Sequence, residues 1–330
     1  MRAIVDVIQR LSFLVLLSFI FSASVQAAEL FAVADNHNVW TGLGVHWVWY
    51  ALFLAVMTWA VALGVGLFYH RILTHRVAKP KRGLGYFFVT VALPAGTPIQ
   101  WVGNHRFHHQ VADTPDDPHS PSDHGFWVAH AGWYLNTKKT WICVLYSFAG
   151  PLRMLFDAYW RPRTNLEYVD KAKDIAADPY YAWISKPGPY ALIVVGHVVV
   201  TWAFVYWLWG AMALPFLYTV QFIYFAIGDA VNSILHMKGK RPFKSGDKST
   251  NIGILGFITS GESYHNTHHA FPSAVNIGIL PGQFDLNYFW CRVFEKVGLM
   301  TDLRMPPKKL ILSKLEDESS REFLEINYRW

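Results

Sequence analysis

Three long apolar runs constrain this chain of 330 residues more than any other feature. They cover residues 46–69, 190–209 and 212–231, and only a turn at Gly210 and Ala211 separates the second from the third. At about 1.5 Å per residue, a helix of about 20 residues crosses the roughly 30 Å hydrocarbon core of a bilayer. The chain is also 53% hydrophobic and only 16% charged, which is too apolar for an ordinary soluble domain. The sequence therefore predicts an all-α integral membrane protein.

The first 28 residues resemble a targeting segment. Two arginines precede an apolar stretch, residues 11–25, and small residues follow it, which is the pattern of a secretory signal peptide. The stretch is also about as long as a short membrane span. Residues 1–28 are therefore expected to be either a cleaved signal or a first transmembrane helix, and residues 29–330 the main domain.

The distribution of basic residues predicts which side of the membrane each part faces. Of the 29 Lys and Arg residues, two lie in residues 1–28, fourteen in 70–189 and thirteen in 232–330, while 29–69 and 190–231 contain none. Basic loops stay in the cytoplasm. The N-terminus and the regions 103–189 and 232–330 are therefore expected to be cytoplasmic, in the inner or plasma membrane if the protein is bacterial. Because the basic residues are scattered among apolar runs, they indicate anionic lipid, acyl-CoA or an acidic redox partner, and no nucleic acid.

One further apolar segment, residues 83–102, complicates this topology. It contains Pro94, Gly96 and Pro98, which interrupt a helix, and Gln100 follows them. An interrupted helix within the hydrocarbon region of the membrane is tolerated where other parts of the protein cover it. We therefore expect a re-entrant segment that returns to the side it started from, in a fold of four spans with a helical cytoplasmic cap.

Histidines gather in three short clusters at the edges of these apolar runs. Because residues three and four apart share a helix face, the last two clusters can each direct three imidazoles to one place. A ninth histidine ends the last apolar run, four residues after an asparagine. The residues concerned are His70 and His75; His105, His108 and His109; His265, His268 and His269; and Asn232 with His236.

So many imidazoles exceed the needs of one tetrahedral metal, so two metals are predicted. His70 and His75 are five apart, which separates them by about 140° on an α-helix; they are expected to serve different metals or to lie where a helix ends. Imidazole alone leaves the metal open. Iron is favoured because a cytoplasmic site at the mouth of an apolar bundle suits oxygen activation against a buried hydrocarbon. Cys143 and Cys291 lie too far apart in the sequence to suggest a thiolate site.

The remaining histidines are given other roles. His197, alone in an apolar run, is expected to be a packed or hydrogen-bonded helix residue, and His37 and His46 are expected at the opposite membrane surface. Three more histidines lie near the clusters in the sequence and are expected to have structural or supporting roles. They are His119, His124 and His130.

Taken together, these motifs resemble the membrane fatty acid desaturases, in particular the stearoyl-CoA Δ9 branch. The family's HxxxxH, HxxHH and HxxHH boxes appear here at 70–75, 105–109 and 265–269, and the branch's Asn-Ser-x-x-His appears at 232–236. Further similarity lies in residues 113–119, 125–133, 177–179 and 261–264, so the resemblance covers about residues 40–305. The combination of motifs is highly specific, so the family's functional residues can be assigned to the matching positions of this sequence.

The resemblance implies four membrane helices and a cytoplasmic di-iron centre held by nine histidines, with Asn232 contacting one iron through water. Two ferrous irons and O₂ would remove hydrogens from two neighbouring methylenes and leave a cis double bond in a fatty acyl-CoA or acyl-lipid. Both termini would be cytoplasmic, which favours retaining residues 11–28 as the first span. Because no cofactor motif for electron supply is visible, a separate donor similar to cytochrome b5, ferredoxin or rubredoxin, with its reductase, is expected.

Carboxylates are expected to orient the histidine ligands. The candidates are Asp113, Asp116, Asp178 and Glu262.

Three other functions also involve histidines in a membrane protein. A di-iron hydroxylase or ketolase of another lipid or hydrocarbon is the closest, and the Asn-Ser-x-x-His motif with two HxxHH boxes favours desaturation over it. A histidine-rich membrane metal transporter would need polar residues within the spans, where only His197 and Asp229 occur. A haem protein would leave most of the nine histidines unexplained.

Overall fold

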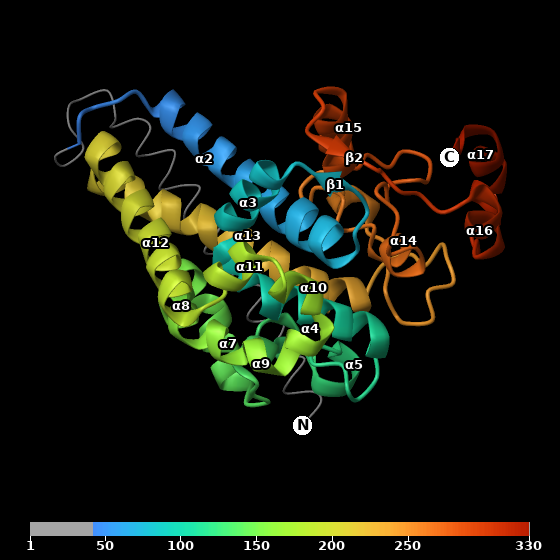
Figure 1. Ribbon diagram of the computed structural model, residues 1–330, viewed down its shortest axis with the longest axis horizontal. Coiled ribbons are helices and arrows are strands. Elements are labelled where there is room, and N and C mark those ends of the chain that lie inside the picture. Colours follow the sequence, from blue (N-terminus) through green and yellow to red (C-terminus); the bar gives the residue numbers. More distant parts are fainter. Residues whose placement is uncertain (1–41, 330) are drawn as a thin grey trace. The chain divides into compact units, whose positions relative to one another are not determined.

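The computed structural model describes residues 42–329, and the regular structure within them is almost entirely helical (Figure 1). The signal-like segment 1–28, with the expected first span, lies outside the described residues. The described residues form two compact units, one of residues 42–54 and 200–220 and the other of residues 55–199 and 221–329.

The long helices and the two short strands set the framework, and short helical turns connect them. In chain order the elements are α2 (Trp47–Ala62), η1 (Leu63–Thr74), β1 (Lys79–Pro80), α3 (Arg82–Val91), η2 (Leu93–Ala95), α4 (Pro98–Val111), α5 (Pro121–His124), α6 (Phe126–His130), η3 (Gly132–Leu135), α7 (Thr140–Phe148), η4 (Gly150–Leu152), α8 (Arg153–Trp160), η5 (Arg161–Thr164), α9 (Asn165–Tyr168), η6 (Val169–Lys171), α10 (Lys173–Ala176), α11 (Pro179–Ile184), α12 (Pro187–Trp209), η7 (Ala211–Ala213), α13 (Leu214–Ser233), η8 (Ile234–His236), η9 (Gly253–Leu255), α14 (His265–Ala270), α15 (Leu286–Lys296), β2 (Met300–Thr301), α16 (Lys308–Ser313), η10 (Glu318–Ser320) and α17 (Arg321–Asn327).

Three helices in the described part of the chain are long and apolar enough to cross a membrane. They are Trp47–Thr74, formed by α2 and η1; Pro187–Trp209, which is α12; and Ala211–His236, which contains α13. These helices fall on the three apolar runs read from the sequence. The protein therefore has the helical, membrane-type architecture that the sequence predicts.

The segment expected to re-enter the membrane is broken in two. Residues 82–111 form α3, of 10 residues, and α4, of 14 residues, and Gly96 between them has a φ of 136°, which favours glycine. Thr97 then begins α4, because its side chain accepts a hydrogen bond from the Gln100 backbone N–H and Pro98 follows it. Neither helix is long enough to cross a bilayer alone, and the re-entrant path stays a prediction.

The first unit is held together by aromatic and backbone contacts. The Tyr50 hydroxyl donates to the Ala213 carbonyl at 2.6 Å, and the Tyr50 ring lies 5.0 Å from that of Trp209. The Leu43 N–H also bonds the Trp207 carbonyl at 3.0 Å. These contacts satisfy polar groups inside an otherwise apolar unit, as a lipid environment requires.

The core of the second unit lies around η1, α3 and α15. Phe68 stacks on Phe88 with ring centroids 4.6 Å apart, and Phe294 packs against both rings. Close helix contact depends on small residues: a Cβ added at Gly103 of α4 would lie 2.3 Å from the Tyr168 carbonyl oxygen. This packing fixes the ends of η1 and α4, where two of the histidine clusters lie.

A second core supports the short helix α14. Phe243, Phe271, Ile311 and Leu324 are buried around it. The side-chain oxygen of Asn251 accepts hydrogen bonds from the first backbone N–H groups of α14, at residues 266 and 267. Because a helix of six residues is too short to be stable alone, this capping and packing keep α14 in place.

Candidate metal centre

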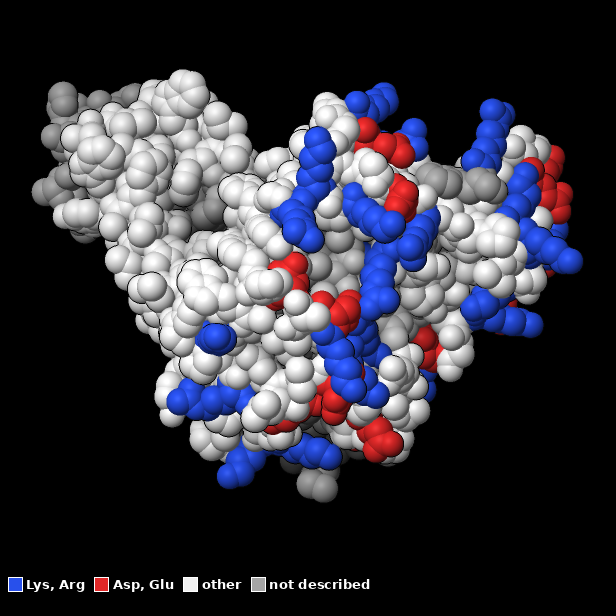
Figure 2. Space-filling view, in the orientation of Figure 1, with Lys and Arg blue, Asp and Glu red and all other residues white. Residues whose placement is uncertain are grey.

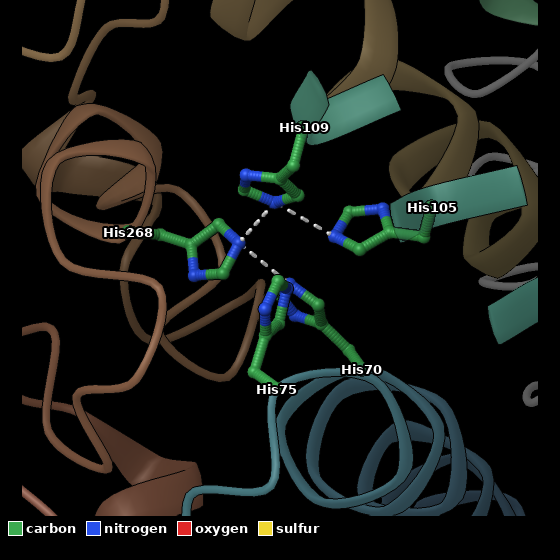
Figure 3. A group of neighbouring side chains, drawn as sticks. All are labelled: His70, His75, His105, His109 and His268. Atoms are coloured by element: carbon green, nitrogen blue, oxygen red, sulfur yellow. Dashed lines mark hydrogen bonds between the residues drawn. The ribbon is translucent and has the colours of Figure 1, made fainter. Parts of the chain in front are cut away.

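Five histidines from three elements meet in one buried cluster (Figure 3). His70 lies on η1 and His75 directly follows that helix, His105 and His109 come from α4, and His268 comes from α14. The Nε2 atom of His268 lies 2.9 Å from those of both His70 and His109, and the Nε2 atoms of His105 and His109 are 3.1 Å apart. Their candidate ligand atoms all lie within 4.8 Å of one another.

Four further histidines, all buried, form a second cluster beside the first. They are His108 of α4, His236 of η8, and His265 and His269 of α14. The His265 Nε2 atom lies 3.0 Å from that of His236 and 3.1 Å from that of His269, while the His108 and His269 Nε2 atoms are 3.4 Å apart. Helices α4 and α14 therefore contribute to both clusters, which corrects the expectation that each directs its three imidazoles to one place: His108 and His268 each lie in the other cluster from their two neighbours.

The structure corrects the expectation that His70 and His75 serve different metals, because both point into the five-histidine cluster. His70 lies within η1, which is a π-helix, whereas the backbone N–H of His75 bonds the Ile72 carbonyl at the end of that helix, so the 140° separation expected on a continuous α-helix does not apply. His75 directly follows η1 as its C-terminal cap, which agrees with the other expectation, that the pair lies where a helix ends.

Carboxylates contact the Nδ1 atoms of four of these histidines. Glu262 lies 2.5 Å from His70, and burial alone would raise its pKa, but His70 and Arg71 outweigh that effect and lower the pKa of its carboxyl to about 2. The three other pairs belong to the second cluster. They are His236 with Asp113 at 2.8 Å, His269 with Asp247 at 2.6 Å and His108 with Asp117 at 3.0 Å.

Two of the four carboxylates named from the sequence, Asp113 and Glu262, are in this set, and two are not. Asp116 is exposed, and Asp178 instead caps α11 by accepting from the Tyr180 and Tyr181 N–H groups. Asp117, which the sequence analysis passed over, adjoins Asp116. Asp247 was also missed, because no spacing links it to a histidine cluster.

The donor set fits metal cations. His108 and His269 each direct Nδ1 at a carboxylate, so in the neutral tautomer their Nε2 atoms carry lone pairs. Burial and neighbouring imidazoles lower the pKa of His108 well below its usual value, and burial also lowers that of His269 although Asp247 opposes it. Two lone pairs facing each other at 3.4 Å repel unless a cation lies between them.

The distances within the clusters agree with this interpretation. Two imidazole nitrogens bound to one metal at about 2.1 Å, with an angle of about 90–110° between them, stand about 3.0–3.4 Å apart. The Nε2 pairs of the two clusters are separated by 2.9–3.4 Å. The Nε2 atom of His75 is buried and has no hydrogen-bond partner, as expected of an atom that serves as a ligand.

Other polar residues lie around the clusters. The His119 ring lies 4.1 Å from that of His108, and its Nδ1 atom is 3.6 Å from Asp117. The His130 Nδ1 atom is 2.9 Å from the Ser233 hydroxyl, next to Asn232 on α13. Asn232 is half-buried one turn before His236, and its contact with a metal through water stays a prediction.

Two isolated histidines have local partners. His197 contacts the Ile193 carbonyl within α12 at 2.8 Å, which confirms its expected structural role. His46 accepts from the Val48 N–H at 3.1 Å at the start of α2.

These features define a class of protein: a membrane-type helical protein with two histidine clusters suited to metal. Sequence comparison identifies the family. The fatty acid desaturase family model matches residues 45–276. Delta-9 acyl-lipid desaturase 1 of Arabidopsis thaliana is 33% identical over 266 residues, which are 79% of this chain and 77% of that protein.

Two other relatives show the range of the match. The acyl-CoA C20 Delta5-desaturase of Anemone leveillei is 34% identical over 263 residues, 79% of this chain and 74% of that protein. The sn-1 stearoyl-lipid 9-desaturase of Anabaena variabilis is 31% identical over 295 residues, 88% of this chain and 94% of that protein. The chain belongs to the fatty acid desaturase family, and it is an oxygen-dependent oxidoreductase acting on acyl chains.

Proposed function

We propose that the two histidine clusters hold two ferrous irons and that the enzyme inserts a cis double bond at Δ9 of a saturated acyl chain. The observation that carries this proposal is the meeting of nine imidazoles in two groups, with carboxylates on the Nδ1 atoms of four of them. Bound iron would supply the activation of O₂ that the removal of two hydrogens requires. In this proposal all nine histidines are ligands, and Asn232 contacts one metal through water.

The chain's own residues orient the site. A carboxylate that accepts the Nδ1–H of an imidazole fixes its tautomer and turns the Nε2 lone pair toward the metal. Arg71, which is buried, supports one such carboxylate: it donates to Glu262 at 2.9 Å and to Asp285 at 2.6 Å. A rigid set of ligands of this kind holds the oxidising centre in place relative to a bound acyl chain.

The Δ9 position is supported by the relatives, although they differ among themselves. Those from Arabidopsis and Anabaena are named Δ9 or stearoyl 9-desaturases, while the Anemone protein is named a Δ5-desaturase. Their names also divide between acyl-lipid and acyl-CoA. We infer Δ9 from the additional Asn-Ser-x-x-His motif at 232–236, and an acyl-CoA or acyl-lipid as the substrate.

We infer that electrons come from a separate protein that docks on the cytoplasmic face. Exposed basic residues include Lys173, Lys238, Lys240 and Arg241, and Lys171 contacts the Gln110 side chain on α4. Figure 2 shows Lys and Arg side chains over β1, α3 and α10 of the second unit, with Asp and Glu side chains among them. The chain as a whole carries a formal net charge of +6. Such a surface attracts an acidic donor, similar to cytochrome b5, ferredoxin or rubredoxin, and raises its rate of association.

Product analysis tests the function. The protein, expressed in a host that lacks monounsaturated fatty acids, is expected to produce them, and mass spectrometry locates the double bond. A bond at another position would contradict Δ9, and a hydroxylated product would favour the hydroxylase alternative.

Histidine variants test the metal centre separately. His268→Ala and His105→Ala are expected to lose iron and activity while still inserting into the membrane. His46→Ala, an exposed histidine outside both clusters, is the control and should retain both. Double-bond formation by His268→Ala at the parental rate would refute the assignment of that cluster.

A further inference from the structure

The helical hairpin of residues 140–162, formed by α7, η4, α8 and the start of η5, has its polarity reversed relative to a soluble surface. Its three charged residues, Arg153, Asp157 and Arg161, are at most 4% exposed. Its large exposed side chains are all apolar or aromatic, each 47–64% exposed. They are Trp141, Leu145, Leu152, Leu155, Phe156 and Tyr159. Soluble proteins place charged side chains outside and bury such residues.

The buried charges are paired inside the molecule. Arg153 donates to Asp229 of α13 at 2.6 and 3.1 Å, and its guanidinium lies 4.2 Å from the centre of the Phe225 ring. Asp157 accepts from the Tyr146 hydroxyl at 2.7 Å and lies 3.5 Å from Arg161. Pairing lets these groups lie in an apolar environment without water, which is how charged residues are accommodated inside membranes.

The hairpin packs against a helix that is itself a candidate membrane span. Phe148 of α7 stacks on Phe222 of α13 with ring centroids 6.1 Å apart, and Arg153 of α8 contacts Asp229. These contacts lie seven to fourteen residues before His236, the end of that span. At about 1.5 Å per residue, they extend about 10–21 Å into the span from its histidine end.

Exposed charged residues lie at both ends of the hairpin. Lys138 and Lys139 directly precede α7, and Arg163 follows α8; all three are exposed. Lys and Arg at such positions reach lipid headgroups, and Trp and Tyr favour the same interface. Because α7 and α8 have only nine and eight residues, neither is long enough to cross the bilayer.

We propose that this hairpin is embedded in one leaflet of the bilayer, the leaflet beside the histidine clusters, and that lipid acyl chains cover its exposed apolar side chains. It is then a lipid-binding surface additional to the spans. The location follows from its contacts with the histidine end of α13, and the occupant from the inward-facing charges and the basic residues at the rim.

Fluorescence quenching tests this in the full-length protein in lipid vesicles. A bimane label is attached to Leu155→Cys, and in the matched control to Ile326→Cys, a comparably exposed apolar position on α17. Both native cysteines, Cys143 and Cys291, are buried, so the unmodified protein measures background labelling. We expect the label at 155 to lose most of its fluorescence to lipids brominated on their acyl chains and little to aqueous iodide, and the label at 326 to show the reverse.

Either of two results would overturn the proposal. Quenching of the label at 155 by iodide, but not by brominated lipid, would show that the hairpin faces water. Quenching by neither would show that protein covers it, such as a second copy of the chain. The same pair of measurements on Leu145→Cys, on the other helix of the hairpin, guards against a local disturbance at Leu155.

Discussion

Asp117 shows how much a single carboxylate contributes to the metal centre. It is fully buried, contacts His108 and accepts hydrogen bonds from the backbone N–H groups of Asp113 and His119. Its neighbour Asp116 is exposed. Sequence alone does not distinguish the two, because the backbone turn that points one side chain inward and the other outward depends on contacts with the rest of the fold.

We predict that Asp117→Asn weakens metal binding about 10–100-fold, as is typical when the partner of a metal-binding histidine is lost. The amide carries no charge and holds the His108 tautomer less strongly. Asp116→Asn, the adjacent control, should leave affinity unchanged. Metal titration of the purified variants measures both. Equal affinities would mean that Asp117 does not orient His108.

At the scale of elements, η1 limited what the sequence could establish. Spacing accounts for only part of the two clusters: His105 and His109, and likewise His265 and His269, are four apart and share an α-helix face, whereas His108 and His268 join the other cluster. The place of His75 could not be found in this way, because His75 lies just past the end of η1, a π-helix, where α-helical spacing does not hold. Helix η1 packs against α3 and α4, and no local pattern in the sequence reveals these contacts.

Arg106 of α4 links the end of η1 to α10. Its guanidinium donates to the carbonyls of Leu73 at 2.8 Å and Thr74 at 3.0 Å, which the helix end leaves without partners. It also pairs with Asp174 at 2.6 Å. Burial raises the pKa of the Asp174 carboxyl, but Arg106 and Arg76 outweigh this effect and lower that pKa to about 2. The ion pair is therefore fully formed at neutral pH and is lost only as the pH falls from 3.8 toward 2.

We expect Arg106→Gln to destabilise the protein by about 1–3 kcal/mol, because buried carbonyl groups at the end of η1 lose their donors. It should also weaken metal binding by displacing His75. Arg76→Gln is the control, because Arg76 pairs with the same Asp174 but its side chain is 61% exposed. Thermal unfolding in detergent and metal content measure the two effects. The same loss in both variants would assign the effect to Asp174 and not to the helix end.

At the scale of the molecule, the sequence predicted the three described spans because long apolar runs can be recognised from length and composition alone. It did not predict the hairpin of 140–162, which was assigned to a mixed-polarity cytoplasmic cap. Arg153, Asp157 and Arg161 interrupt its apolar residues in the sequence, and only the fold shows that these charges face inward. Polarity patterns in a sequence do not reveal buried charges whose partners lie far away along the chain, as Asp229 does from Arg153.

Topology gives the last prediction. His70 and His75 lie in one cluster with His105 and His109, so the chain between them must begin and end on the same side of the membrane. A reporter fused after His75 and another after Gln110 should therefore both report the cytoplasm, the side that the basic residues favour. A fusion after Gly210, between α12 and α13, should report the opposite side and is the control. Opposite sides for the first two fusions would refute the re-entrant segment, since a full crossing at residues 83–102 would separate histidines that must meet.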